Sequence, residues 1–265
     1  MERNSGAFPG TKKAGDIVSA LLSRNKSAPP LYFSRGHSAF LLMLLFAAIL
    51  HAEPPEHKII ISQDTVFSDH FFIPENRTCI IKPGVKILFD DYRKIIVCGL
   101  LIAQGKPDAP IHFSCVDRPR GSTGSPCWTG FVIYGEKADA LLRHCRIEGA
   151  YKNIIWEANP VFDSCEFAGN HYALYCIKKA APHVKNCTIY RNVYGVVSDF
   201  AAPLLLNNLI TENTVGVYLQ LSAELVAGKN IIEKNDTNIR TEQCLGPTKK
   251  PLSLHYLWEL MRELY

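Results

Sequence analysis

The chain has 265 residues, of which 47% are hydrophobic and 20% are charged, as in an ordinary folded globular protein. The formal net charge is +4, and residues 1–38 account for all of it, with six basic residues against two acidic ones. Because nucleic-acid recognition depends on neutralising phosphates, the neutral remainder argues against a nucleic-acid partner.

Residues 1–52 are expected to form a basic leader followed by a signal peptide or a short anchor. The apolar run at 39–50 is shorter than the roughly 20 residues that cross a bilayer, but it suits the apolar part of a signal peptide. Leu50-His51-Ala52 offers only one of the two small residues expected before a cleavage site. We therefore expect export to the periplasm, the cell surface or the medium. A start downstream of Met1, an uncleaved membrane anchor at 39–52 and a buried helix remain alternatives.

A repeat of 20 to 22 residues between about 141 and 239 predicts the architecture. Short β-rich runs such as 194–197 and 215–219 alternate with Asn, Gly and Pro at constant phase, without a leucine-rich frame or helical spacing. Asn170, Asn192, Asn213 and Asn235 recur at steps of 22, 21 and 22 residues. Stacked at the strand spacing of about 4.8 Å, these amides would hydrogen-bond from coil to coil. The pattern predicts an all-β parallel β-helix of about eight coils over residues 53–243.

The segment from 73 to about 239 resembles the right-handed parallel β-helix repeat proteins of the pectin-lyase-like superfamily. The resemblance includes residues 73–76 with 81–89, residues 96–105 with 109–113, and Trp128-Thr-Gly-Phe-Val-Ile133, which is similar to a Trp-x-Gly-Ile element of that family. The later coils also resemble the β-helix of periplasmic copper-enzyme maturation factors. The resemblance implies a right-handed parallel β-helix, whereas a fold of this kind does not define a function.

Five of the nine cysteines fall into two groups. Cys145, Cys165 and Cys187 share one repeat position, two residues before an apolar residue that should face the core, so we expect them to form a buried structural stack. A disulfide between coils or a metal site are the alternatives, but the short-range ligand pairs of a zinc site are missing and no metal is expected. Cys115 and Cys127 flank a segment rich in Gly, Pro and Ser, and they are the better disulfide candidate in an exported protein.

Catalytic residues cannot be assigned from the sequence. Of the motifs of hydrolases that cut polygalacturonate, only Asp90-Asp91 is present, in a predicted turn. For a lyase, the acidic candidates do not share one repeat phase, as a calcium site would require; they are Glu148, Asp163, Glu166 and Glu212. The available bases are Arg143, Arg146 and Arg191, although an always-protonated arginine needs a special setting to accept a proton. His171 is a further candidate without an identifiable proton-transfer partner. No cofactor is therefore expected, except calcium if the protein is a lyase.

Aromatic residues supply the positive indication of a ligand. Flat amphipathic rings suit the apolar faces of sugars, and tyrosine hydroxyls bond to sugar hydroxyls. Candidates on successive coils are Tyr151, Trp156, Tyr172, Tyr175, Tyr190 and Tyr194, followed by Tyr218. The alternative is that these rings face inward or shield turns.

The last segment, residues 244–265, is expected to be a linker followed by a short helix. Leu254, Leu257, Trp258, Met261 and Leu264 recur at helical spacing. Because the last repeat of a solenoid exposes an apolar end, we expect this helix to cap the stack. A helix that binds a partner or lies on a membrane surface is the alternative.

The sequence favours a non-enzymatic envelope or surface protein that binds a carbohydrate or a protein along one β-sheet face. The alternative is a polysaccharide lyase or glycoside hydrolase of the pectin-lyase-like superfamily, and a third possibility is a maturation factor that delivers metal to an exported enzyme. Convergent acids and bases in a cleft would favour an enzyme, whereas a groove with exposed aromatic side chains would favour a binding module. Metal delivery would require Cys or His side chains that reach solvent.

Overall fold

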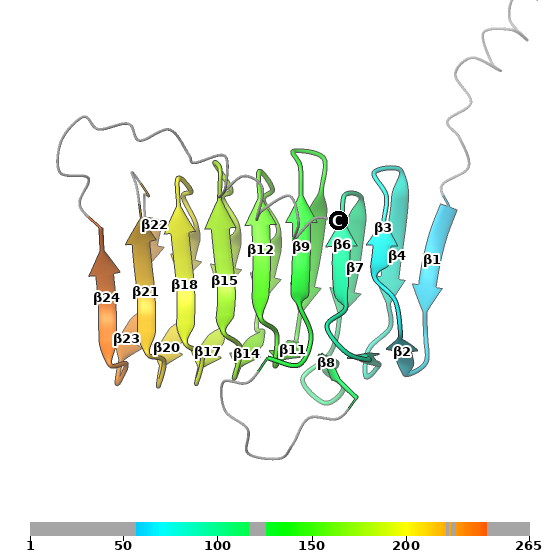
Figure 1. Ribbon diagram of the computed structural model, residues 1–265, viewed down its shortest axis with the longest axis horizontal. Helices are drawn as coiled ribbons and strands as arrows, with labels where there is room; N and C mark the ends of the chain where they lie inside the picture. Colours follow the sequence, from blue (N-terminus) through cyan, green and yellow to red (C-terminus); the bar gives the residue numbers. More distant parts are fainter. Residues whose placement is uncertain (1–56, 117–125, 221–222, 224–225, 243–265) are drawn as a thin grey trace, which may run out of the picture. The chain divides into compact units, whose positions relative to one another are not determined.

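The computed structural model describes residues 57–116, 126–220, 223 and 226–242. These residues form eight coils, each of which contributes one strand to each of three parallel sheets (Figure 1). Every described element is a β-strand. The predicted all-β parallel solenoid of about eight coils is therefore confirmed. The leader at 1–52 and the C-terminal helix within 244–265 lie outside the described residues.

Consecutive strands pass from the first sheet to the second and then to the third. The first sheet contains β1 (His57–Ile61), β4 (Arg77–Ile81), β7 (Leu100–Gln104), β10 (Asp139–Arg143), β13 (Val161–Asp163), β16 (His183–Lys185), β19 (Leu204–Leu206) and β22 (Val226–Gly228). The second sheet contains β2 (Thr65–Phe67), β5 (Lys86–Phe89), β8 (Ile111–Cys115), β11 (Cys145–Glu148), β14 (Glu166–Ala168), β17 (Thr188–Tyr190), β20 (Leu209–Thr211) and β23 (Ile231–Glu233). The third sheet contains β3 (Phe71–Ile73), β6 (Lys94–Val97), β9 (Gly130–Tyr134), β12 (Lys152–Trp156), β15 (Tyr172–Ile177), β18 (Tyr194–Asp199), β21 (Val215–Gln220) and β24 (Thr237–Thr241).

The strand register explains the repeat in the sequence. Leu141 pairs with Val161, Val161 with His183, His183 with Leu204, and Leu204 with Val226. One turn of the solenoid therefore takes 20 to 22 residues in this part of the chain. The preceding turn is longer and contains the disulfide between Cys115 and Cys127, which are 12 positions apart.

Apolar side chains fill the interior of the coils. On the second sheet one inward column runs in register from Ile87 through Phe113, Ile147 and Phe167 to Ile189, and each of these side chains is 0% exposed. Burial of such a column contributes about 25 cal/mol per Å² of apolar surface removed from water. The strands alternate between inward and outward side chains, so this column holds the sheet to the core.

The corners of the coils use backbone in the left-handed region. Between the first and second sheets the corner residues with φ of 46° to 56° are His144, Ser164, Asn186, Asn207 and Lys229. Between the second and third sheets they are Gly149, Gly169, Arg191, Glu212 and Lys234, with φ of 55° to 69°. Left-handed backbone turns the chain sharply, which allows a strand to end and the next to begin after one or two residues.

Four of the corners between the second and third sheets are followed by a residue of the asparagine ladder, Asn170, Asn192, Asn213 and Asn235. The backbone N–H of Asn170 donates to Oδ1 of Asn192 at 2.8 Å, and Nδ2 of Asn170 donates to the same oxygen at 3.0 Å. The pattern repeats from Asn192 to Asn213 and from Asn213 to Asn235. Asn170, Asn192 and Asn213 are at most 3% exposed, so each amide satisfies backbone groups that water does not reach.

A second ladder follows the corners between the first and second sheets. It contains Cys145, Cys165 and Cys187, and it continues as Asn208 and Asn230. The backbone N–H of Cys187 donates to Oδ1 of Asn208 at 2.9 Å, and that of Asn208 donates to Oδ1 of Asn230 at 2.9 Å. The three cysteines are at most 2% exposed and are not disulfide-bonded. Sequence reasoning missed the two asparagines of this ladder, although each lies two residues before an apolar residue of the core, as the cysteines do.

Candidate binding face on the third sheet

The outer side of the third sheet is apolar and aromatic in its central coils. Five outward side chains pair in one column from β9 to β21, and each is at most 8% exposed. They are Val132, Ile154, Tyr175, Val197 and Tyr218. Together with their apolar neighbours they form a cluster separate from the interior core, which we call the outer cluster.

An extra residue in β15 brings two tyrosines to this face. Lys152 pairs with Tyr172 and Ile154 pairs with Tyr175, so β15 has two residues where β12 has one. The simple alternation of a strand would place Tyr172 and Tyr175 on opposite sides. The bulge turns both rings outward, and their centroids lie 5.5 Å apart.

Three tyrosine rings stack from coil to coil, and we call them the tyrosine ladder. The Tyr172 and Tyr194 rings have centroids 4.7 Å apart and planes 7° apart. The Tyr194 and Tyr218 rings follow at 6.1 Å and 21°. Offset stacking of this kind contributes about 0.5 to 1.5 kcal/mol per pair beyond area burial.

A cation covers each end of the tyrosine ladder. Nζ of Lys152 lies 5.0 Å from the ring centroid of Tyr172 and 5.0 Å from that of Tyr175. At the other end, the guanidinium of Arg240 lies 4.8 Å from the ring centroid of Tyr218. The ring faces are therefore occupied by other rings and by cations.

A pocket of about 330 Å³ lies along this ladder. Its lining consists of Lys152, Tyr172, Tyr175, Tyr194, Val197, Tyr218, Gln220 and Arg240. Among these described residues two are cationic and none is acidic, so the pocket favours negative charge. The Tyr218 hydroxyl contacts the carboxylate of Glu242, and burial together with this hydrogen bond raises the pKa of Tyr218.

Two further candidates lie near this pocket. Tyr151 stacks on the imidazole of His171, with centroids 5.3 Å apart. The His171 ring also contacts Tyr172 and Tyr194, and burial and the charge of Lys152 lower the pKa of His171. His171 is therefore neutral at pH 7 and surrounded by rings.

The remaining aromatic candidates divide between two sheets. Trp156 belongs to the outer cluster, where its ring contacts Tyr134 at 5.4 Å and Nζ of Lys178 at 4.6 Å. Tyr190 lies instead on β17 of the second sheet, and Arg191 lies 5.8 Å from its ring centroid. The structure therefore places Tyr190 apart from the other candidates. Its strand precedes the corner between the second and third sheets, whereas the other candidate rings lie beyond that corner.

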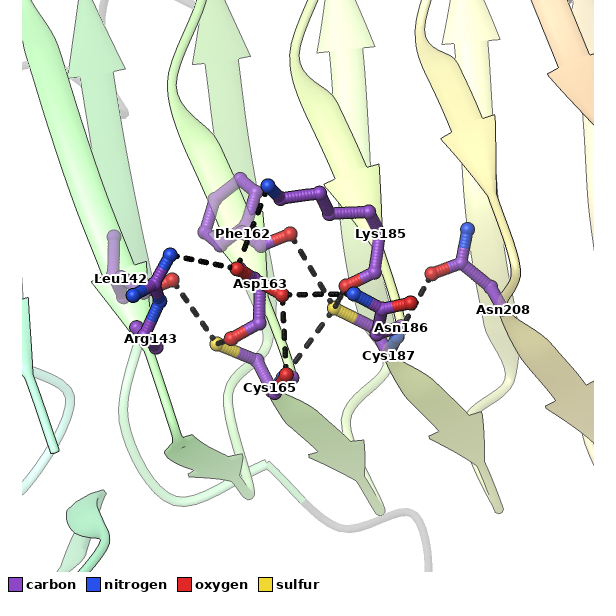
Figure 2. Close-up of polar contacts among 10 residues, drawn as sticks. Leu142, Arg143, Phe162, Asp163, Cys165, Lys185, Asn186, Cys187 and Asn208 are labelled. Carbon is purple, nitrogen blue, oxygen red and sulfur yellow. Dashed lines mark hydrogen bonds and ion pairs between the residues drawn. The ribbon is translucent and has the colours of Figure 1, made fainter. Parts of the chain in front are cut away.

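Asp163 is the centre of a polar network on the first sheet (Figure 2). Its carboxylate accepts hydrogen bonds from Arg143 at 3.0 Å, Asn186 at 3.0 Å and Ser164 at 3.1 Å, and Lys185 lies 3.5 Å away. Burial raises the pKa of Asp163, but the hydrogen bonds and the two cations outweigh it and hold that pKa below its ordinary value of 3.8. The network joins three neighbouring coils and favours an ionised carboxylate.

The other acidic candidates pair with cations elsewhere. Glu148 and Glu166 contact Arg146 on the second sheet. Glu212 contacts Arg191 at a corner, with Nε and Oε2 2.8 Å apart. Asp163, these glutamates and His171 thus lie on different faces and do not converge on one cleft.

The thiol stack lies inside the coils. Burial raises the pKa of Cys165, and the contact with Cys165 together with burial raises that of Cys187, so both remain protonated thiols at neutral pH. Within the described ranges, no group of three His, Cys, Asp or Glu side chains could hold a metal ion. Because these thiols do not reach solvent, the hypothesis that the protein delivers a metal through them loses its main support.

Comparison with known proteins agrees with the architecture. Residues 125–237 match the family model described as a right handed beta helix region. No curated protein and no solved structure matches the chain. No helix among the described residues has the length and apolarity to cross a membrane. From its eight coils and this family match, the chain is a parallel β-helix repeat protein.

Proposed function

We propose that this β-helix is a non-enzymatic binding module and that its ligand is an anionic polysaccharide held along the outer face of the third sheet. The observation that carries this proposal is the tyrosine ladder with a cation at each end, beside a pocket whose described lining residues include no acidic side chain. The cations would bind carboxylate or sulfate groups, and tyrosine hydroxyls with Gln220 would bind sugar hydroxyls.

The length of the site suits a polymer. The lining residues come from five consecutive strands of the third sheet, β12 to β24. Four strand spacings amount to about 19 Å, enough for several sugar units lying along the stack. Since the tyrosine faces are already covered, we propose recognition through hydrogen bonds and charge, rather than the stacking of sugars on flat rings that the sequence suggested.

Export fits this proposal. The apolar run at 39–50 would direct the protein to the envelope or beyond it, where acidic polysaccharides are found. An envelope protein is the alternative occupant of the same face, and binding to such a protein would also be non-enzymatic.

Binding of the purified full chain to a panel of acidic and neutral polysaccharides tests the proposal. We expect binding to acidic polymers that weakens with salt. Lys152→Gln and Arg240→Gln should each weaken it about tenfold, as the loss of one charged contact implies. Arg146→Gln, which changes a cation of the second sheet, is the matched control and should bind as the wild type does.

Two results would refute the proposal. Equal binding of neutral polymers, or equal losses in all three variants, would remove the role of this face. Release of reducing ends or unsaturated uronates would favour the lyase or hydrolase alternative instead.

A further inference from the structure

An exposed aromatic side chain lies on the outer face of the third sheet in the first coil. Phe71 and Ile73 of β3 pack with the interior core, so Phe72 between them points outward. Phe72 is 52% exposed, whereas Tyr175 and Tyr218, which point outward further along the same sheet, are 8% and 7% exposed. The Phe72 ring therefore offers a surface that a ligand can reach, unlike the covered rings of the tyrosine ladder.

Positive charge lies beside this ring. His70 comes two residues before Phe72 and so lies on the same side of the strand. Lys94 lies beside His70 on the neighbouring strand, β6. Burial and then the charges of Lys94 and Arg93 lower the pKa of His70, and Asp69 raises it less. At this imidazole the two cations thus outweigh the carboxylate, and the surface favours an anion.

This surface continues into the tyrosine ladder (Figure 1). The strands β3, β6, β9 and β12 are consecutive neighbours in the third sheet, followed by the strands of the ladder. In the outward row that contains Lys94, the next position is Gly130, which has no side chain, and Lys152 follows on β12. Three strand spacings, about 14 Å, separate β3 from β12. A polymer that occupies the pocket can therefore extend across β9 and β6 to Phe72.

We propose that Phe72, His70 and Lys94 belong to a second subsite for the same anionic polysaccharide, in which the Phe72 ring stacks on the apolar face of a sugar. A flat aromatic ring suits such a face, and the positive charge beside it attracts the carboxylate or sulfate group of the same sugar or its neighbour. Together with the pocket, the binding face then covers all eight strands of the third sheet, seven spacings or about 34 Å. This inference rests on the proposed function and specifies its ligand as a long polymer of acidic sugars.

Binding of short and long fragments by the full chain tests this subsite. The probes are polygalacturonate, alginate and heparin, each cut into fragments shorter than about 19 Å, the length of the pocket, and longer than about 34 Å. We expect the long fragments to bind about tenfold more tightly than the short ones, because they occupy two linked subsites. A long fragment also has more registers in which to bind, but that advantage is the same in every variant.

Variants of the first two coils assign this gain in affinity. Phe72→Ala should remove most of it and leave the binding of short fragments unchanged, whereas Phe72→Trp should keep it. The matched control is Phe200→Ala, since Phe200 is 48% exposed but lies at the corner that follows β18. Arg93→Gln should reduce the gain by weakening the positive charge, and Arg77→Gln, which changes a cation of the first sheet in the same coil, should retain it. Thermal melts establish that each variant is folded.

The Phe72→Trp protein also reports contact directly. Its added indole occupies an exposed position, so acrylamide should quench the fluorescence more than in the unsubstituted chain, in which Trp128 and Trp156 are 0% and 6% exposed. A bound long fragment should remove this additional quenching, because the sugar covers the ring. The same titration with the unsubstituted chain is the baseline.

The outcomes distinguish this subsite from the proposed function. The subsite is overturned by equal affinity for short and long fragments, by an equal gain in Phe72→Ala and Phe200→Ala, or by an indole that stays open to acrylamide beneath a long fragment. In each of these cases binding of short fragments at the pocket still supports the proposed function. If none of the three polymers binds, the proposed function and the subsite that depends on it are both refuted.

Discussion

The asparagine ladder should be the most sensitive polar element of the fold, and Asn192 is its central member. Oδ1 of Asn192 accepts from the backbone N–H and Nδ2 of Asn170. Nδ2 of Asn192 donates to the carbonyls of Phe167 and Tyr190 and to Oδ1 of Asn213, at 2.9 to 3.0 Å. The side chain is 3% exposed, so water does not replace these partners.

Asn192→Ala would leave the backbone N–H of Asn170 without its acceptor in a buried corner. A buried donor of this kind costs about 1 to 3 kcal/mol. The loss of the bonds made by Nδ2 adds about 1 kcal/mol or more, because the carbonyls at that corner lose a donor. We therefore expect the free energy of unfolding to fall by about 3 kcal/mol.

Urea unfolding followed by circular dichroism measures this difference, with Asn235→Ala as the control. Asn235 makes the same contacts with Asn213 but lies in the last coil, where it is partly exposed. Water can replace its amide, so the same change there should cost only about 1 kcal/mol. Equal costs at the two positions, or a cost below 1 kcal/mol at Asn192, would refute the view that buried coil-to-coil bonding stabilises the corners.

Three further predictions concern the same scaffold. Because the pKa of Asp163 is lowered in the folded protein, the ionised carboxylate should stabilise the fold fully at pH values above its ordinary pKa of 3.8, and this stabilisation should disappear as the pH falls through the folded-state pKa. Urea titrations at several pH values should show this dependence, and Asp163→Asn should remove it. The Lys229→Gly protein should have a free energy of unfolding about 1 kcal/mol higher than the Lys229→Ala protein, since the exposed Lys229 has a φ of 54°, which strains any residue with a Cβ. Equal melting temperatures of the two variants would contradict this. Replacing both Cys115 and Cys127 with Ser should cost up to about 3 kcal/mol for a loop closed over 12 positions, and reduction of the wild type should match that loss in a thermal melt.

The ladders show what a sequence of this kind reveals. Asn170, Asn192, Asn213 and Asn235 were predictable because identical residues at constant phase must meet when coils stack. The second ladder was only half predicted, because it changes from cysteine to asparagine between Cys187 and Asn208. A search for one residue type cannot detect a column in which two chemistries satisfy the same backbone groups.

The outer face was harder to predict, for a geometric reason. Repeat phase places a tyrosine on a coil but does not decide the direction of its ring. The bulge in β15 cancels the two-residue alternation between Tyr172 and Tyr175. The corner separates Tyr190 from Tyr194, although the two are only four positions apart in sequence. The coverage of ring faces by Lys152 and Arg240 depends on side-chain packing, which no sequence period describes.

The direction of the asparagine ladder makes the length of this protein adjustable. Each ladder amide accepts a hydrogen bond from the coil before it and donates one to the coil after it, so the acceptor on one side of a coil matches the donor on the other side of its neighbour. A duplicated unit of 21 residues, copied from 192–212 and inserted behind itself, would find an acceptor on one side and a donor on the other. Insertion or deletion of whole coils can thus change the length of the outer face along the stack without requiring a new corner structure.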